Sequence, residues 1–309
     1  MKKKLRNFCE SICMKVSIVI PWYNTEWLVQ KNLPAVLAAV KNSNNNILEI
    51  IIVDDGSSDS SISIIKDKFP DIKLIRHKIN RGFSASVNTG VRASKGELIC
   101  LLNSDVVPQI DFLEAVFIHF KDSKVFAVSL NEDGEFSWAK GVFEGGFIKH
   151  SPGPKSTSSH KTFWVSGGSG VFRRKTWMEL GGMDERLFSP FYWEDLDLSY
   201  RAMKRGYQLI WDPNAKVEHK HETTMKRLPQ EYVNRIRERN QLLFIWKNLT
   251  SMGLTRKHIS GLVKRVLGHP GYLRIVIMAL CKIGSALKAR IKETKEAKIS
   301  DELIFSRFF

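Results

Sequence analysis

The 309-residue sequence contains few cysteines and no long uninterrupted apolar run. No window of roughly 18 apolar residues is free of charged side chains, so we expect no membrane-spanning helix. The basic N-terminal stretch MKKKLRNFCESIC lacks the apolar core of a secretory signal, which predicts a cytoplasmic protein with residues 1–14 as an N-terminal extension. The cysteines lack the spacing of a zinc site and are too few for a disulfide framework, which predicts reduced thiols at Cys9, Cys13, Cys100 and Cys281.

The sequence also lacks a glycine loop of the kind that binds phosphate. GGFIKH, SGGSG and LGGMD are glycine-rich, but they match neither the Walker pattern nor the dinucleotide-binding pattern. No order of Ser, His and Asp or of Cys and His indicates a nucleophilic triad. These absences argue against a P-loop nucleotide hydrolase and a Rossmann dehydrogenase.

Positive charge is abundant, and most of it lies near the C-terminus. The formal net charge is +16. Residues 1–219 carry 29 Lys and Arg against 25 Asp and Glu, a net of +4, whereas residues 220–309 carry 19 against 7, a net of +12. The basicity therefore indicates a partner of the C-terminal region.

Three interpretations of this basic region remain open: an anionic membrane surface, packing against the core or another copy of the chain, and nucleic acid. The stretch YLRIVIMALCKIGSALKARIK interleaves apolar and basic residues, as interfacial helices do. We therefore favour a membrane surface over nucleic acid, with a homodimer as an alternative. The apolar run from Ile275 to Leu287 would lie in the interface, and the basic side chains expected to face headgroups are Arg274, Lys282, Lys288, Arg290 and Lys292.

Periodicity predicts an α/β fold, with a mostly parallel sheet flanked by helices and a helical extension at the C-terminus. Short β-branched runs predict strands at 16–21, 48–55, 72–77 and 97–105, and amphipathic stretches predict helices at 25–41, 58–68 and 83–94. Residues 131–162, rich in Gly, Pro and Ser, are predicted to be loops, followed by a strand from 163 and a helix near 175–180. The predicted domains are 15–225 and a basic helical region at 226–309, with helices at 230–247, 255–267 and 271–292.

Polar residues follow the predicted parallel strands, where ligands bind in such sheets. Asp54 and Asp55 either accept hydrogen bonds from a nucleotide or cap the next helix. Asp105 either holds a divalent cation or caps a helix. His219 and His221 lie two residues apart in an extended segment, so they face the same side and suit either a metal or ordinary packing.

The stretch SPFYWEDLDLSYR concentrates three carboxylates at the start of a predicted helix that ends near Arg205. Asp197 precedes Arg201 by four residues, so the spacing predicts a structural ion pair. Asp195 falls in the first turn, where the helix dipole favours the ionised carboxylate. We expect Tyr192 and Trp193 to shield it from water.

Several motifs occur together and in one order. They are VSIVIPWYN, IIIVDDGSSD, NRGFSASVNTG, ELICLLNSD, VSGGSGVFRRKTWMELGGMDERLF and YWEDLDLSYRAMKRGYQLIWDP. Over roughly residues 15 to 248 the chain resembles the family 2 glycosyltransferases of the GT-A nucleotide-diphospho-sugar transferase fold, in particular their bacterial rhamnosyltransferase-like branch.

The resemblance implies roles for particular residues. Asp195 matches the catalytic base, and Asp105 the metal-binding end of a DxD motif in which Asn103 replaces the first Asp with a less charged ligand. His219 or His221 would complete the coordination of Mg²⁺ or Mn²⁺. The residues implied in nucleotide-sugar binding are Pro21, Tyr23, Asn24, Asp54, Arg81, Gly82, Asn103, Ser104 and Asp105. The residues implied in acceptor binding are Trp164, Gly167, Gly168, Trp193 and Glu194.

The function implied is that of a metal-dependent, inverting hexosyltransferase. It would move a sugar from a UDP, dTDP or GDP donor to a hydroxyl of a glycan or lipid-linked acceptor in cell-surface polysaccharide synthesis. The expected location is cytoplasmic, peripheral on the inner face of the cell membrane. The alternatives are a catalytically degenerate scaffold and a basic nucleic-acid-binding protein, and the intact Asp54, Asp105 and Asp195 argue against the scaffold.

Overall fold

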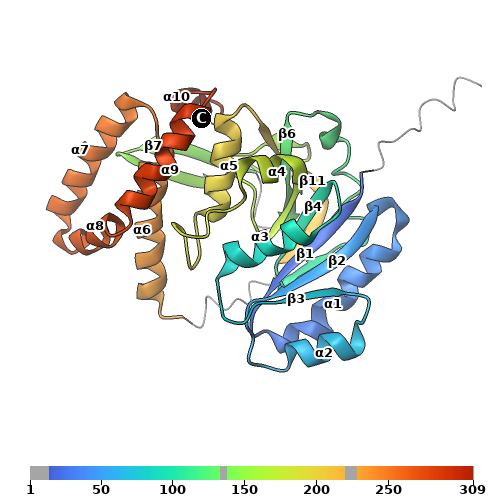
Figure 1. Ribbon diagram of the computed structural model, residues 1–309. Helices are drawn as coiled ribbons and strands as arrows, with labels where there is room; N and C mark the ends of the chain where they lie inside the picture. Colours follow the sequence, from blue (N-terminus) through green and yellow to red (C-terminus); the bar gives the residue numbers. More distant parts are fainter. Residues whose placement is uncertain (1–13, 133–137, 220–227, 309) are drawn as a thin grey trace, which may run out of the picture.

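The computed structural model describes residues 14–132, 138–219 and 228–308 (Figure 1). The predicted N-terminal extension therefore lies almost entirely outside the described residues, as does His221.

The first half of the sheet is parallel, as predicted. β1 (Val16–Trp22) pairs in parallel with β2 (Ile47–Asp54) and with β4 (Leu98–Leu102), and β3 (Lys73–Arg76) extends the sheet beyond β2. The connecting helices are α1 (Glu26–Lys41), α2 (Ser61–Lys68) and α3 (Phe83–Ala93), close to the predicted ranges. A short 3₁₀ turn, η2 (Ser43–Asn45), precedes β2.

Alternate residues of β1 serve two separate cores, because successive strand side chains point to opposite faces. Ile18 and Ile20 pack with the side chains of α1 and α2. Val19 lies on the other face, in the cluster that also contains side chains of α3 and of the C-terminal helices. Both faces of the sheet are therefore covered, which explains the continuous apolar runs of its strands.

The second half of the sheet is mixed. Beyond β4 the order continues β10-β6-β11-β5, and β9 pairs with β11. The pairings of β10 with β4 and β6, and of β11 with β5 and β9, are antiparallel. The pairing of β6 with β11 is parallel, so the predicted parallel arrangement is confirmed up to β4 and is mixed with antiparallel pairs beyond it. The strands and helices from β5 to β11, apart from β7 and β8, are β5 (Val106–Pro108), η3 (His119–Lys121), β6 (Val125–Glu132), β9 (His160–Lys161), β10 (Ser169–Arg173), α4 (Arg174–Leu180), α5 (Glu194–Lys204) and β11 (Gln208–His219).

The prediction of loops throughout 131–162 is wrong, because this segment contains a β-hairpin. β7 (Ala139–Glu144) and β8 (Phe147–Pro152) pair in antiparallel register. Gly145 and Gly146 connect them with φ angles of +60° and +87°. Two consecutive positive φ angles are what a tight hairpin turn requires, so these glycines form a turn and not a loop.

Five helices follow in the described range 228–308: α6 (Gln230–Asn248), α7 (Met252–Gly268), α8 (Leu273–Leu280), α9 (Ile283–Glu296) and α10 (Asp301–Ser306), with the turn η5 (Pro270–Tyr272) before α8. The single helix predicted at 271–292 is wrong, since the chain bends between α8 and α9. Within the described ranges no single helix has both the length and the composition to cross a membrane. The segments Pro270–Leu280 and Ile283–Glu296 pass that test only as a pair, bent by 67°.

The C-terminal helices share a core with the part of the chain that forms the large sheet. Leu242, Phe244, Ile304 and Phe305 belong to the same buried cluster as Trp177 and Leu198. Lys204 of α5 and Asp301 of α10 form a buried ion pair at 2.7 Å. Helices α6 and α10 are therefore integral to the fold.

Candidate active site

A cavity of about 1010 Å³ opens beyond the carboxyl ends of β1 and β4. Its volume lies at the upper end of the range of ligand pockets, about 300–1,000 Å³. Twelve of the predicted site residues line it: Pro21, Tyr23, Gly82, Asn103, Ser104, Asp105, Trp164, Gly168, Trp193, Glu194, Asp195 and His219. Asn24, Asp54, Arg81 and Gly167 do not line it.

The two carboxylates after β2 have different surroundings. Asp54 is fully buried, and its carboxylate pairs with Arg76 at 3.0 Å. Asp55 lines the cavity and accepts hydrogen bonds from the backbone N–H groups of Arg81 at 2.9 Å and Gly82 at 2.7 Å. Asp55 therefore shapes the cavity wall, while Asp54 fastens the end of the strand.

The other predicted residues that do not line the cavity support its wall. Asn24, at φ +48°, accepts a hydrogen bond from the backbone N–H of Ser58 at 2.8 Å and so joins the turns after β1 and β2. The Arg81 side chain turns to Glu185, 3.1 Å away. Gly167 donates its backbone N–H to Asp195 Oδ2 at 3.3 Å.

Asn103, Ser104 and Asp105 follow β4 directly into the cavity wall. The backbone N–H of Asn103 donates to the carbonyl of Gly168 at 2.8 Å. A Cβ at Gly168 would lie 2.3 Å from the Asn103 amide nitrogen, so this close approach requires glycine.

Asp105, His219 and Glu132 form a chain of polar contacts along the cavity. Asp105 Oδ1 lies 3.2 Å from His219 Nε2, and His219 Nδ1 lies 3.2 Å from Glu132 Oε2. Burial favours neutral imidazole, but the two carboxylates outweigh it and raise the pKa of His219 to about 9. The other oxygen of Asp105, Oδ2, is buried and has no hydrogen-bond partner among the described residues.

Asp195 is the second residue of α5, which confirms its predicted place in the first turn. Its Oδ1 accepts the backbone N–H of Leu196 at 2.8 Å, and its Oδ2 accepts that of Gly167. Tyr192 and Trp193, just before the helix, have φ angles of +68° and +77°. Such angles are strained for aromatic residues, so other contacts must hold this segment in place.

Helix α6 holds the segment before α5. The fully buried Asn240 donates its side-chain amide to the carbonyls of Phe188, Phe191 and Tyr192 at 2.9–3.0 Å. The neighbouring Arg239 donates to the carbonyl of Ser189 at 2.7 Å. The position of Asp195 thus depends on a helix that lies about fifty residues further along the chain.

Burial perturbs both carboxylates at the start of α5. It raises the pKa of Asp195, although hydrogen bonds from the backbone of Gly167 and Leu196 oppose the rise. Burial and the neighbouring Asp195 hold the pKa of Glu194 well above its ordinary value. A carboxylate with a raised pKa is a stronger base than an exposed Asp, which suits Asp195 to removing a proton from a hydroxyl.

Aromatic rings line the part of the cavity next to α5. His150 of β8 lies edge-on to Trp164 and Trp193, with ring centroids 5.8 and 6.2 Å apart. The guanidinium of Arg237 lies 4.9 Å from the centre of the Tyr192 ring. Aromatic faces with a cationic neighbour are suited to a sugar or a glycan.

Asp197 has a structural role, as predicted. It is fully buried and accepts hydrogen bonds from Arg201 at 2.8 Å, Lys247 at 3.0 Å and Asn248 at 2.8 Å. The i,i+4 pair with Arg201 is confirmed, and the contacts with α6 join that helix to α5.

Two family models match the chain. The model described as Glycosyl transferase family 2 matches residues 17–177, and that described as Glycosyl transferase family group 2 matches residues 98–284. The chain belongs to the family 2 glycosyltransferases.

A relative of known name agrees with this membership. Pre-mycofactocin glycosyltransferase of Mycobacterium tuberculosis is 30% identical over 192 residues, which cover 58% of this chain and 39% of the relative. The chain thus spans about two fifths of that relative's length. The rhamnosyltransferase-like branch stays a prediction.

Two solved structures show the GT-A fold of this glycosyltransferase. GalNAc-T7 with UDP, GalNAc and Mn²⁺ superposes with a TM-score of 0.59 at 15% identity, covering 84% of this chain and 57% of that one. Mannosyltransferase PcManGT from Pyrobaculum calidifontis with GDP-Man and Mn²⁺ gives 0.54 at 16% identity, covering 90% and 86%.

The side chains around Asp105 fit a divalent cation that has few protein ligands. Within the described ranges no group of three His, Cys, Asp or Glu side chains is arranged to hold a metal by itself. Neighbouring ligands of an octahedral Mg²⁺, each about 2.1 Å from the ion, lie about 3 Å apart. The 3.2 Å between Asp105 Oδ1 and His219 Nε2 matches that spacing.

Sequence reasoning missed several residues that shape the glycosyltransferase cavity. Asp55 follows Asp54 directly in the sequence, but the motif does not show which of the two carboxylates faces the cavity. Glu132 is the last residue of β6 and belongs to no motif, yet it contacts His219. Asn240 lies in a helix that resembles any amphipathic helix, and only the folded chain brings it to the segment before α5.

Proposed function

We propose that this family 2 glycosyltransferase is an inverting enzyme that transfers a hexosyl group from a nucleotide-diphosphate sugar to an acceptor hydroxyl. The observation that carries the proposal is one cavity lined both by a carboxylate with a raised pKa, Asp195, and by the pair Asp105 and His219. An inverting transfer needs a base on one side of the anomeric carbon and support for a departing diphosphate on the other.

In the proposed step, the acceptor oxygen attacks the anomeric carbon as Asp195 takes the proton of the hydroxyl. The bond between that carbon and the diphosphate oxygen breaks, and its electron pair leaves with the nucleoside diphosphate. The backbone N–H groups that bind Asp195 fix the direction of its carboxylate. Trp193 limits the access of water to the base, because its ring is buried beside it.

We assign the metal site to Asp105 and His219, with Asn103 beside them and His221 outside the described residues; a cation bound there would take the place of the proton that the two carboxylates favour on His219. A divalent cation bound there would supply positive charge against the leaving diphosphate. The buried Asp105 Oδ2 without a hydrogen-bond partner supports this assignment, since an uncompensated buried carboxylate oxygen is costly. Mn²⁺ in the two structures of similar fold supports it further, while the choice between Mg²⁺ and Mn²⁺ stays open.

We assign the nucleotide to the ends of β1 and β2 and to the Asp55-bound loop, where Pro21, Tyr23 and Gly82 line the cavity. UDP and GDP-Man in those two structures support a UDP, GDP or dTDP donor. The aromatic rings near α5 support a sugar-bearing acceptor, either a glycan or a lipid-linked glycan. Cell-surface polysaccharide synthesis and a cytoplasmic location stay predictions.

A thermal-shift panel of UDP-, dTDP- and GDP-sugars, with and without Mn²⁺, tests the proposal. A true donor raises the unfolding temperature, because it binds only the folded state. The donor that binds is then incubated with the enzyme alone, and NMR follows the anomeric configuration of the sugar released to water. The proposal predicts a metal-dependent shift and inversion. No shift with any donor, or retention at the anomeric carbon, would contradict it.

A further inference from the structure

The exposed apolar side chains of the molecule are concentrated on α7, α8 and α9. Of the eighteen large apolar side chains exposed in the described part of the chain, nine belong to these helices. The three helices lie together at the end of the molecule opposite α1 and α2 (Figure 1). Soluble surfaces usually scatter such side chains singly, so a concentration of them indicates a contact surface.

On α7 the apolar side chains form one stripe. Met252, Ile259, Val263 and Leu267 are 53–76% exposed. Their spacings of seven, four and four residues place them on one face of the helix. An apolar stripe on a helix normally faces a core, and here it faces outward.

The opposite face of α7 is fixed to the protein. His258 is 2% exposed, with Nδ1 2.7 Å from the carbonyl of Gly146, and the indole N–H of Trp246 donates to its Nε2 at 3.0 Å. The guanidinium of Arg265 lies 3.6 Å from the centre of the Phe147 ring. The helix therefore cannot turn its apolar stripe inward without breaking these contacts.

Helices α8 and α9 divide their apolar residues between the core and the surface. Ile275, Ala279 and Ala286 are buried, so part of the run from Ile275 to Leu287 serves packing. Ile277 and Leu287 remain about half exposed, at 52% and 50%.

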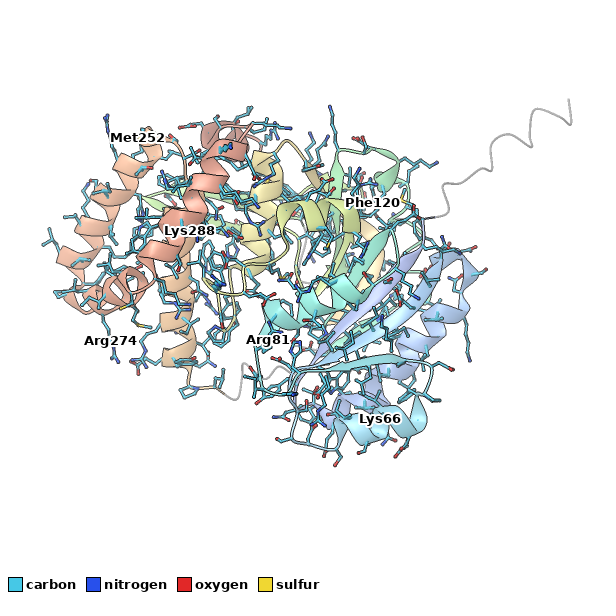
Figure 2. All side chains as sticks on the ribbon, in the orientation of Figure 1. Lys66, Arg81, Phe120, Met252, Arg274 and Lys288 are labelled. Atoms are coloured by element: carbon cyan, nitrogen blue, oxygen red, sulfur yellow. The ribbon has the colours of Figure 1, made fainter. Side chains whose placement is uncertain are left out.

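The charge on these helices is almost entirely positive. Residues 252–296 carry ten Lys and Arg but only two acids, Glu293 and Glu296. Both acids pair with Arg205 of the catalytic half, so they partly face inward. Seven of the basic side chains are exposed, among them Arg274 and Lys288, which Figure 2 labels on this part of the molecule.

Two of the basic side chains that the sequence predicts to face headgroups, Lys282 and Arg290, instead donate hydrogen bonds to backbone carbonyls. Lys282 donates to the carbonyls of Arg186 and Leu187 at 2.7 and 3.1 Å. Arg290 donates to the carbonyl of Trp246 at 3.1 Å. Lys282 thus attaches the turn between α8 and α9 to the segment that leads to α5, and Arg290 attaches α9 to α6.

We propose that the outward faces of α7, α8 and α9 bind an anionic lipid bilayer. Exposed apolar side chains flanked by exposed cations match the interface between acyl chains and anionic headgroups. A second copy of the chain fits poorly, because a two-fold interface would bring the same cationic surface against itself. Nucleic acid would neutralise the cations but leave the apolar stripe in water.

The helices that carry this surface also contact the segment that leads to the acceptor side of the active site. Lys282, between α8 and α9, contacts the carbonyls just before the Asn240-bound segment. If the proposed function holds, a bilayer on this surface would bring a lipid-linked acceptor close to Asp195.

The test is flotation of the full-length chain with vesicles of phosphatidylcholine alone or mixed with phosphatidylglycerol, at low and high salt. Binding is expected only to the anionic vesicles and is expected to weaken with salt. The variant Lys257→Gln/Lys264→Gln/Arg274→Gln should partition about 100-fold less, at about fivefold for each charge near the surface. The matched control Lys66→Gln/Lys121→Gln/Lys124→Gln, at exposed basic positions of the other half, should bind as the unaltered chain does.

The apolar contribution is tested by Ile259→Gln/Val263→Gln/Leu267→Gln against Leu48→Gln/Ile110→Gln/Ile118→Gln, which alters equally exposed side chains elsewhere. Only the first variant should lose vesicle binding, with the thermal midpoint of both unchanged. Equal binding by all variants, or no preference for anionic vesicles, would overturn the proposal. So would a dimer that only the α7 variant disrupts. Donor binding measured without lipid tests the proposed function separately.

Discussion

The two sides of the active-site cavity are built in different ways. On the donor side, the wall consists of residues at strand ends, and its supports come from neighbouring strand-to-helix turns, such as Asp55 with Arg81 and Asn24 with Ser58. On the acceptor side, the strained backbone at Tyr192 and Trp193 is held by Asn240 of α6. The first side follows from local sequence, whereas the second depends on the packing of the C-terminal helices.

The largest effect is expected for Asp195→Asn. If Asp195 is the base, transfer should fall by about 10²–10⁴-fold, because the amide cannot accept the proton of the acceptor hydroxyl. Donor affinity should be unchanged, since the donor side does not depend on this group. Steady-state rates and calorimetry with the same preparation measure both quantities, and near-normal turnover would exclude the role.

A stability comparison probes the attachment of α6 to α5. Asp197→Asn leaves Arg201 and Lys247 with less compensating charge in a buried site, so the free energy of unfolding should fall by about 3–5 kcal/mol. Glu231→Gln removes an exposed i,i+4 partner of Arg235 and should change the free energy of unfolding by no more than about 0.5 kcal/mol. Urea denaturation measures both, and equal effects would show that the buried cluster does not anchor α6.

A smaller effect is expected in the pH profile. The base must be ionised to act, so the rate should fall as the pH drops through the pKa of Asp195. Because burial raises that pKa, the fall should begin at a higher pH than for an exposed Asp. Glu194→Gln should keep the acidic limb with its midpoint nearly unchanged, because the raised pKa of Glu194 leaves that side chain neutral while Asp195 titrates. A rate that is flat through the acidic range would contradict the assignment.

The sequence predicted the strand ends of the donor side from their pattern, and the reason is physical. Buried parallel strands are continuous apolar runs, and the polar residues that end them must reach the same edge of the sheet, so Asn103 and Asp105 were placed correctly in the cavity wall. Which of the two side chains, Asp54 or Asp55, faces the cavity could not be predicted from the strand pattern, because it depends on the twist of the last strand residue.

On the acceptor side, the sequence predicted the residues of a local motif but not the distant residues that support them. Asp195 and Trp193 were found because they belong to a dense local motif at a helix start. The contact between Asn240 and the segment before α5 has no local signature, since it joins residues about fifty positions apart. The bend between α8 and α9 was likewise missed, because apolar periodicity continues through it and both helices pack against α6 on either side of it.

The central claim, that a local donor side and a remotely held acceptor side meet in one cavity, is tested most directly by a crossed measurement. Donor dissociation constants in Mn²⁺ and rates of sugar-nucleotide hydrolysis are determined for Asp105→Ala and Asn240→Ala, with Gln241→Ala as a control that loses a hydrogen bond elsewhere on α6. Asp105→Ala should weaken donor binding about 10–100-fold, the range expected when a metal site is disturbed. Asn240→Ala should leave donor binding unchanged and lower the hydrolysis rate. If both variants weaken donor binding equally, the two sides are not independent and the account is contradicted.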